Sequence, residues 1–380
     1  LAHPPPPGGR RGGAGGRRGA TEQVQYRCDL LALWPSWPPP TPNGSTVGPP
    51  SGPDAASRPR WSAPDSGATN LGRATVPAME QGCWRPGPRG WGEHPMRPPG
   101  HDGIMAPMAT IEVDGTTLYY EATGKGPALL FIHGMCGDAD VWADQARRFD
   151  DRHTCVRYDR RGHSRSEWGE HPISPARHAD DAASLIEALG LAPCLLVGSS
   201  GGAVVAFEVA RRHRHLLRGT VLSEPPLFGV EPGAGRAFMG QLAPRLEQAL
   251  AEGGPAAGVD AFFSFVCPGL WSAIEEGRKD RYRANAGIGF ADLKAPPIDL
   301  EPADLAAIDL PVLVLAGTAS HPAFGSVARR LAAGLPDARF VELEGSGHVT
   351  YAERPDAFAR AVAAFATEIA GQAGLGGTRR

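Results

Sequence analysis

The fold is decided by residues 195–206, which read Leu-Leu-Val-Gly-Ser-Ser-Gly-Gly-Ala-Val-Val-Ala. A short apolar run ends in Gly-Ser-Ser-Gly-Gly, and small and apolar residues at helical spacing follow it. This order predicts a buried strand, a sharp turn and a helix, with Ser200 at the turn. Glycines two residues before and after a serine relieve crowding in such a turn, and the free N–H groups of the next helix favour a developing negative charge. Ser200 is therefore a candidate nucleophile; the alternative is a Gly/Ser-rich loop without chemical meaning.

The surrounding sequence alternates expected strands and helices. Residues 128–132, Ala-Leu-Leu-Phe-Ile, are a continuous apolar run of the kind found in strands buried on both faces. A hairpin is expected at 110–121, further strands at 154–158, 194–198, 219–223, 311–317 and 339–343, and helices at 139–149, 176–189 and 355–370. This pattern predicts a mostly parallel sheet with helices on both faces, in which ligands bind at the carboxyl ends of the strands. Ser200 and the turn His133-Gly134-Met135 both fall at that end.

Composition limits the possible partners. The chain has 380 residues, 38 Lys and Arg against 41 Asp and Glu, and a net charge of −3, which favours neither a nucleic-acid nor a membrane partner. Its six cysteines show no Cys-x-x-Cys spacing, so neither a zinc site nor a disulfide framework is indicated and a reducing, cytoplasmic location is expected. The sequence lacks metalloprotease, phosphate-loop and dinucleotide motifs, so we predict no cofactor and no metal.

Residues 1–107 differ from the rest of the chain. They contain 21 of the 38 prolines and almost no periodic apolar pattern, so we expect a disordered Pro/Gly/Arg-rich extension. The first residue is Leu1, and Met105 and Met108 stand just before the first expected strand. We interpret the extension as upstream sequence translated from a misplaced start. The alternatives are a partner-binding arm and an export signal, but the apolar patch at 30–33 is shorter than the ~7–15-residue core of a signal peptide.

Four short motifs occur in order within residues 108–371. They are His133-Gly134, Asp159-Arg160-Arg161-Gly162-His163-Ser164, Gly198–Gly202 and Gly345-Ser346-Gly347-His348. Each is weak alone, but together and at this spacing they resemble the α/β-hydrolase fold family. The resemblance implies an α/β fold with a mostly parallel central sheet, flanking helices and a helical cap inserted after strand 6.

The resemblance also implies a role for each turn. Ser200 would be the nucleophile, and His348 would be the general base that takes its proton. The alternative for His348 is a histidine with an ordinary structural role. The oxyanion hole would consist of two backbone N–H groups, one from Gly201 directly after the nucleophile and one from Met135 directly after His133-Gly134.

The sequence departs from the family at the acid of the triad. The family places an aspartate after strand 7, in the pattern P-x-L-x-L-x-G-x-x-D, but Ser320 stands at that position here. Glu224 follows strand 6, where some members, haloalkane dehalogenases among them, carry the acid. We therefore predict Glu224 as the acid; the alternative is a residue that fixes the Pro225-Pro226 turn. Asp309 and Asp337 precede their strands, which places them at the wrong end of the sheet.

Residues 226–307 change to a helical pattern, with helices expected at 236–252, 259–265 and 270–284. The resemblance identifies this segment as the cap, which in the family lines the substrate pocket. Five aromatic side chains are candidates for that lining, with core packing as the alternative: Phe262, Phe263, Phe265, Trp271 and Phe290. Residues 372–380 are expected to form a flexible tail.

Together these features predict a serine hydrolase that cleaves a carboxylic ester, lactone or related acyl substrate through an acyl-enzyme intermediate. Carbon–carbon bond hydrolysis and cofactor-free perhydrolysis, which other family members perform, stay open. A non-hydrolytic small-molecule-binding protein on the same fold is the alternative from another class, and the displaced acid is the feature that favours it. The expected partner is a small acyl substrate, and the oligomeric state is left open.

Overall fold

The computed structural model describes residues 109–169 and 171–376, with side chains described as far as residue 371. The predictions for residues 1–107 and for the last four residues lie outside this range. The helix expected at 355–370 is α12, which continues to Gly376.

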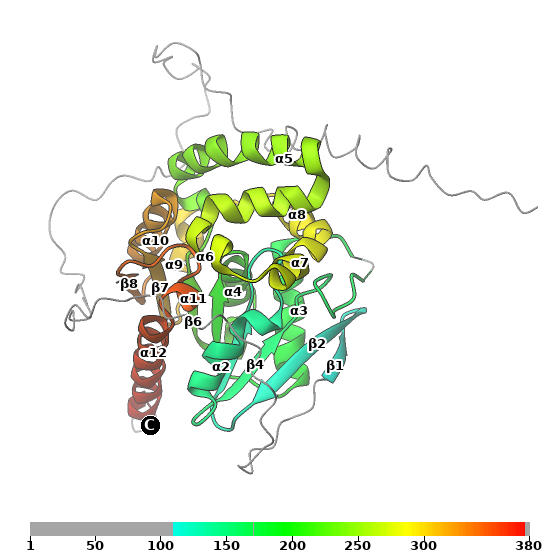
Figure 1. The fold of residues 1–380 in the computed structure, drawn as a ribbon. Helices are drawn as coiled ribbons and strands as arrows, with labels where there is room; N and C mark the ends of the chain where they lie inside the picture. Colours follow the sequence, from blue (N-terminus) through cyan, green and yellow to red (C-terminus); the bar gives the residue numbers. More distant parts are fainter. Residues whose placement is uncertain (1–108, 170, 377–380) are drawn as a thin grey trace, which may run out of the picture.

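One sheet of eight strands forms the centre of the fold (Figure 1). Its strands lie in the order β1-β2-β4-β3-β5-β6-β7-β8; β1 and β4 pair antiparallel with β2, and the other neighbours are parallel. The strands are β1 (Ala109–Val113), β2 (Thr116–Thr123), β3 (Ala128–Ile132), β4 (Thr154–Tyr158), β5 (Cys194–Ser199), β6 (Leu217–Ser223), β7 (Val312–Gly317) and β8 (Ala338–Leu343). This order and the helices on both faces are those of the α/β-hydrolase fold, so the predicted fold class is confirmed.

Alternate residues of the central strands pack on opposite faces of the sheet, because side chains along a strand point to alternate sides. In β3, Leu130 and Ile132 join the core under one set of helices, and Leu129 and Phe131 join the core under the other set. The first set is α3 (Pro175–Ala188), α4 (Gly201–Arg212) and α10 (Pro322–Gly334); the second is α2 (Ala143–Phe149) and α12 (Pro355–Gly376). The continuous apolar runs of the sequence therefore mark strands buried on both faces.

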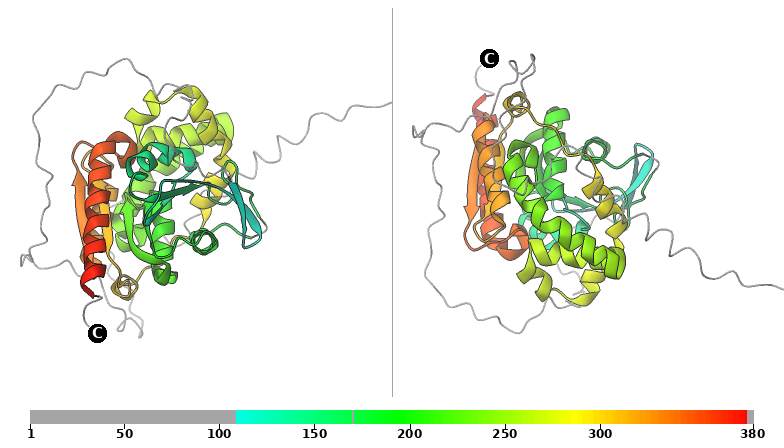
Figure 2. Two further views of the ribbon diagram at one scale, coloured as in Figure 1. Left: turned by 90° about the horizontal axis from the view of Figure 1, so that it is seen from below. Right: turned by 90° about the horizontal axis from the view of Figure 1, so that it is seen from above.

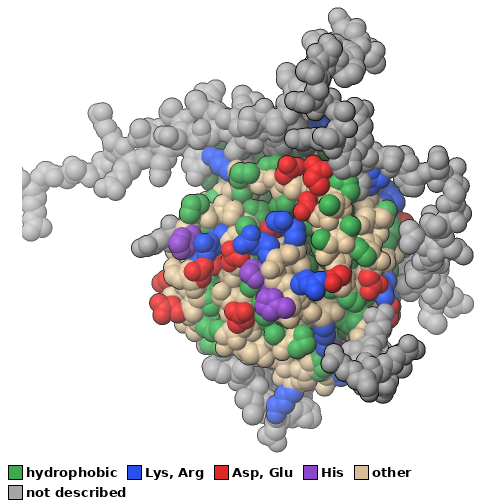
Figure 3. All heavy atoms as spheres, turned by 180° about the vertical axis from the view of Figure 1, so that it is seen from behind, with side chains coloured by type: hydrophobic (Ala, Val, Ile, Leu, Met, Phe, Trp, Pro, Cys, Tyr) green, Lys and Arg blue, Asp and Glu red, His purple; other side chains and the backbone are tan. Residues whose placement is uncertain are grey.

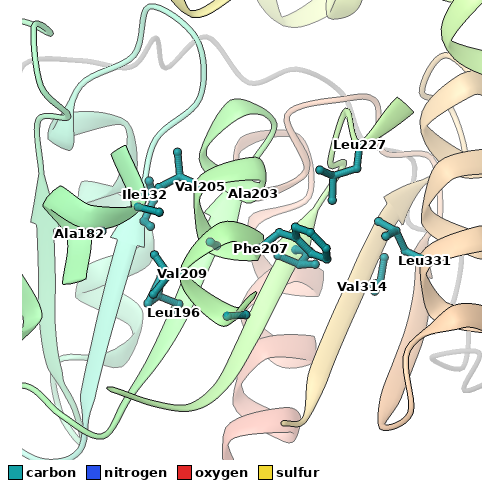
Figure 4. Packing of buried hydrophobic residues seen from close by; sticks show 14 of the residues in the cluster. Ile132, Ala182, Leu196, Ala203, Val205, Phe207, Val209, Leu227, Val314 and Leu331 are labelled. Atoms are coloured by element: carbon teal, nitrogen blue, oxygen red, sulfur yellow. The ribbon is translucent and has the colours of Figure 1, made fainter. Parts of the chain in front are cut away.

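Helix α4 is the helix that the sequence places directly after Ser200, and it is buried along most of its length. Its side chains Phe207 and Val209 lie among apolar residues of the strands, including Leu196 and Val314 (Figure 4). All four side chains are at most 1% exposed. This packing fixes the start of α4, and with it the position of Ser200, against the centre of the sheet.

Four helices between β6 and β7 form a layer that we name the insert: α5 (Pro232–Val266), α6 (Pro268–Ala273), α7 (Glu276–Ala284) and α8 (Ala286–Lys294). It lies across the carboxyl ends of the strands (Figure 2).

The boundaries of the helices in the insert differ from those expected. The helices expected at 236–252 and 259–265 are one run broken at Gly254, where φ is 71°, because the following Pro255 disfavours helical angles before it. The single helix expected at 270–284 is two, α6 and α7, separated by extended backbone at Ile274. A short helix, α9 (Pro302–Ala306), follows before β7.

On the face shown in Figure 3, acidic, basic and apolar side chains are interspersed. Within the described residues, no helix combines the length and the apolar character that a membrane span requires. The cytoplasmic location stays a prediction.

Two glycine-to-alanine substitutions in helices should have opposite effects on stability. A Cβ at Gly202 in α4 would lie 2.1 Å from the Ile132 carbonyl oxygen, whereas a Cβ at Gly240 in α5 meets nothing within 4 Å. We expect Gly202→Ala to lower the free energy of unfolding by about 1–3 kcal/mol through overpacking. Gly240→Ala should raise it by up to about 1 kcal/mol through helix propensity. Urea unfolding followed by circular dichroism measures both free energies of unfolding. Equal effects of the two substitutions would contradict the close contact between α4 and β3 at Gly202.

Candidate active site

Ser200 lies in a strained turn between β5 and α4. Its backbone has φ 53° and ψ −123°, a conformation that residues other than glycine rarely adopt, and its N–H donates to the Ser223 carbonyl 2.9 Å away. A Cβ on Gly198 would lie 2.3 Å from the Gly202 carbonyl oxygen, so only glycine fits there. The Ser200 side chain does not cap α4, which leaves its Oγ free to face the cavity beyond the strands.

His348 meets Ser200 from the loop after β8. Its Nε2 is 3.0 Å from Ser200 Oγ, and the side chain is almost fully buried. The ring of Phe324 from α10 packs against the imidazole with a centroid separation of 4.2 Å. The long-range contact therefore joins two turns that are 148 residues apart in the chain.

Glu224 completes the chain of hydrogen bonds from the end of β6. Its Oε2 lies 3.1 Å from His348 Nδ1, and the side chain is 0% exposed. The backbone at Glu224 has a φ of 51°, which is positive like that of Ser200. An ionised carboxylate can only accept a hydrogen bond, so His348 Nδ1 carries the hydrogen and donates it, and the Nε2 lone pair faces the serine hydroxyl.

Ser320, the residue at the family's usual acid position, donates its hydroxyl to Glu224 Oε2 at 2.5 Å. The N–H of Gly317 donates to the other carboxylate oxygen, Oε1, at 2.7 Å. The end of β7 therefore supplies two donors to a carboxylate that comes from β6. The sequence showed that Ser320 replaces an aspartate, but it gave no sign that the serine binds the displaced acid.

The two backbone N–H groups expected to form an oxyanion hole lie side by side. A Cβ built on Gly201 would be 3.5 Å from the Met135 nitrogen, which places this N–H next to the start of α4. In the described part of the chain, the Met135 N–H donates to no backbone carbonyl. Both residues line the same cavity as Ser200.

The cavity is mainly apolar, and the insert forms part of its wall. Of the five aromatic residues expected to line it, Phe262 does. Phe263 and Trp271 stack on each other at 4.7 Å, and these two, Phe265 and Phe290 do not line it. The aromatic lining comes instead from Phe228 after β6, Phe238 in α5 and Phe324 in α10. Periodic aromatic residues in the sequence did not distinguish lining from core.

One corner of the cavity is polar. Asp292 of α8 accepts from Arg160 Nη2 at 2.8 Å through one oxygen and lies 2.8 Å from His178 Nε2 through the other. Burial alone would raise the pKa of Asp292, but the charge of Arg160 and the contact with His178 hold this pKa below its usual value. The ion pair links the insert to the loop after β4. The sequence analysis places Arg160 in a motif but assigns it no role, and no motif in the sequence points to Asp292 or His178.

Comparison with known proteins places the chain in a family. The sequence model of the alpha/beta hydrolase family matches residues 129–361. The chain belongs to the alpha/beta hydrolase family. It is 37% identical over 122 residues to YraK of Bacillus subtilis, a hydrolase of uncharacterised activity, in a match that spans 31% of this chain and 45% of YraK.

Two further relatives of this alpha/beta hydrolase align over most of their own length. A candidate carbamate hydrolase, RutD of Azorhizobium caulinodans, is 27% identical over 261 residues, 66% of this chain and 96% of RutD. The crystal structure of the enol-lactonase from Burkholderia xenovorans LB400 has a TM-score of 0.57 and 25% identity, covering 68% of this chain and 100% of that chain. The family and the hydrolase names of these relatives confirm the prediction of an α/β-fold hydrolase.

The His348–Glu224 contact predicts a proton signal that can be observed without substrate. A proton held between an imidazole nitrogen and a buried carboxylate is strongly deshielded, because the acceptor is charged. We expect a resonance far downfield of the amide region in the proton NMR spectrum, assigned to His348 Nδ1–H. It should vanish in His348→Ala and move upfield in Glu224→Gln, while His215→Ala leaves it in place. A signal unaffected by Glu224→Gln would mean that the proton has another acceptor.

Proposed function

We propose that this alpha/beta hydrolase is a serine hydrolase that cleaves a carboxylic ester, a lactone or a related acyl substrate through an acyl-enzyme intermediate. The observation that carries the proposal is the continuous chain of hydrogen bonds Ser200–His348–Glu224, which opens into a largely apolar cavity. A serine hydroxyl is a weak nucleophile until a base takes its proton, and the chain places such a base within reach.

In the first half-reaction, Ser200 Oγ attacks the acyl carbon while its proton passes to His348 Nε2. The carbonyl π electrons move onto the oxygen and form a tetrahedral oxyanion. When the carbonyl re-forms, the bond to the leaving alkoxide breaks and His348 returns the proton to that oxygen. Glu224 stays ionised and stabilises the imidazolium that exists between these two transfers.

In the second half-reaction, His348 takes a proton from water and the resulting oxygen nucleophile attacks the acyl-enzyme. A second tetrahedral oxyanion forms, the bond to Ser200 Oγ breaks, and the serine oxygen regains its proton from His348. The products are the free acid and the alcohol, or a hydroxy acid when the substrate is a lactone.

The oxyanion of both steps would be stabilised by the N–H groups of Met135 and Gly201. Preorganised backbone donors are effective because they need no rearrangement when the charge develops. The position of Gly201 at the first turn of α4 adds the positive end of the helix dipole.

The insert acts, in this proposal, as a cap that shapes the substrate site. Its Phe238 and Phe262 provide apolar wall, and Asp292 with Arg160 and His178 provides one polar corner. The names of two relatives, an enol-lactonase and a candidate carbamate hydrolase, support an acyl group as the point of attack. An apolar wall with a single polar corner favours a small substrate with an apolar chain.

Ester hydrolysis by active-site variants tests the proposed roles. We expect the wild type to hydrolyse p-nitrophenyl esters between acetyl and decanoyl, with an optimum chain length that reports the apolar wall. Ser200→Ala should lower kcat by at least about 10⁴-fold because no nucleophile remains. Glu224→Gln should lower it by about 10³–10⁴-fold because the imidazole loses its orienting charge.

Circular dichroism controls for folding, and labelling of Ser200 by a fluorophosphonate separates an enzyme from a binding protein. A folded wild type that hydrolyses no ester and takes up no probe would support the non-hydrolytic alternative. Labelling of Ser200 without ester turnover would direct attention to carbon–carbon bond hydrolysis or perhydrolysis.

The contact between Ser320 and Glu224 predicts a rescue by relocation of the acid. In Glu224→Ala the imidazole has no carboxylate, and kcat should fall as in Glu224→Gln. The added change Ser320→Asp places a carboxylate at a side chain that already reaches the Glu224 oxygen, so the double variant should recover at least about 10-fold of the lost kcat. Ser320→Ala in the Glu224→Ala background is the matched control and should recover nothing. Equal activities of the two double variants would refute the relocation.

A further inference from the structure

The insert contacts the turn that carries the Met135 N–H through one buried side chain. Asn285 stands between α7 and α8, is 5% exposed and points into the loops of the sheet domain. Its Nδ2 lies 3.1 Å from the carbonyl oxygens of both Cys136 and Gly137 and 2.9 Å from Ser164 Oγ, so its two hydrogens are shared among three acceptors. Its Oδ1 accepts from the Ser164 N–H at 2.8 Å. One amide therefore joins the insert to two loops of the sheet domain.

Both loops have an unusual backbone at the point where Asn285 binds. Cys136 has φ 55° and Ser164 has φ 46°, and residues other than glycine pay about 1–3 kcal/mol for such angles unless their surroundings fix them. Cys136 directly follows Met135, so fixing the backbone at Cys136 restricts how far the neighbouring peptide with the Met135 N–H can turn. The Asn285 bonds act on the strained residue itself.

The peptide group between Gly134 and Met135 is also held from its carbonyl side. The Gly134 oxygen accepts from Arg160 Nη2 at 3.2 Å, and His133 Nδ1 lies 2.9 Å from it. His133 Nε2 accepts the Arg160 N–H at 2.9 Å, and burial lowers the pKa of His133 well below its usual value, so Nδ1 carries the proton and donates. A cation on the carbonyl polarises the peptide and strengthens its N–H as a donor. Arg160 is itself held by Asp292 of the insert.

We propose that Asn285 is a positioning residue for the oxyanion hole, through which the insert holds the Met135 N–H in its working orientation. The inference rests on the proposed function, because it concerns the oxyanion of that reaction. It assigns the insert a part in catalysis as well as in substrate selection.

The packing of α8 on this turn supports the same link. A Cβ on Gly289 would lie 2.2 Å from Cys136 Sγ, while Met135 Cγ and Cε would be at 3.4 Å. Cys136 is 1% exposed, so its sulfur has little free space to move into. Glycine at this position lets α8 approach the turn closely enough for Asn285 to bind it.

The first experiment compares Asn285→Ala and Asn285→Asp with Gln248→Ala, which removes an exposed amide of the insert that donates to Glu252. Asn285→Asp keeps the acceptor for Ser164 but loses the donors to the turn. We expect kcat for a p-nitrophenyl ester to fall about 10- to 100-fold in both Asn285 variants, below the ~10²–10³ for loss of an oxyanion donor, while KM changes less than about 3-fold. Gln248→Ala should match the wild type.

Inhibitor binding distinguishes positioning from a general structural effect. A trifluoromethyl ketone adds to Ser200 Oγ and forms an oxyanion, and its inhibition constant should rise by the same factor by which kcat falls. The matching methyl ketone, which binds without forming the oxyanion to a comparable extent, should keep its inhibition constant. If both ketones weaken equally, Asn285 has only a structural role and the inference is wrong.

A second pair of variants applies if the Asn285 variants unfold. Gly289→Ala should push α8 from the turn and lower kcat, and Gly289→Ala combined with Cys136→Ala should restore at least half of the loss by removing the obstructing sulfur. Wild-type kcat in Gly289→Ala, or no restoration in the double variant, would overturn the inference. Fluorophosphonate labelling of Ser200 in the wild type keeps the two proposals apart. A wild type that takes up no probe would overturn the proposed function and this inference with it, whereas a labelled, active wild type with unchanged kcat in the Asn285 variants would overturn this inference alone.

Discussion

The backbone of Ser200 is the constraint on which the other contacts of the site depend. With its angles of φ 53° and ψ −123°, the Ser200 side chain does not cap α4, and its Oγ lies 3.0 Å from His348 Nε2. Such angles cost about 1–3 kcal/mol and persist only where packing fixes them. The fixing elements are the bond to the Ser223 carbonyl and the close contacts of Gly198 and Gly202, and the buried apolar face of α4 offsets the cost. The position of Ser200 is therefore a consequence of how the first turn of α4 crosses the ends of β3 and β5.

The position of the acid follows from geometry, not from its place in the sequence. A carboxylate has to reach His348 Nδ1 inside a buried space, and the ends of β6 and β7 are both adjacent to that space. Glu224 reaches it from β6 with a left-handed backbone, and β7 contributes the donors Gly317 N–H and Ser320 Oγ. A buried carboxylate that lacks such donors would be costly, so the exchange of aspartate for serine and the use of Glu224 complement each other.

The sequence predicted the elements and the three turns that meet at the site because their signals are local. Apolar runs mark doubly buried strands such as β3, and the glycines beside Ser200 mark a turn that only they fit. Glu224 is predicted from the family resemblance, because some members carry the acid after strand 6 and Ser320 stands at the usual acid position, and the structure brings Glu224 to His348. The break at Ile274, the lining by Phe324 and the contacts of Asn285 were not predictable in this way. These features depend on contacts between side chains of the insert and loops more than a hundred residues away in the chain. The periodicity of the sequence does not predict such contacts.

The insert and the sheet domain share polar groups around the turn that carries the Met135 N–H. If the insert only formed a wall, apolar contacts would suffice, and a buried ion pair such as Arg160–Asp292 would be hard to explain, since replacing such pairs by apolar residues is often neutral for stability. These polar groups instead end at the peptide that carries the Met135 N–H, from its carbonyl through Arg160 and from the next residues through Asn285. Under the proposed function, changes in the insert that alter substrate choice would also act on the turn with the Met135 N–H, and selectivity and rate would depend on the same packing.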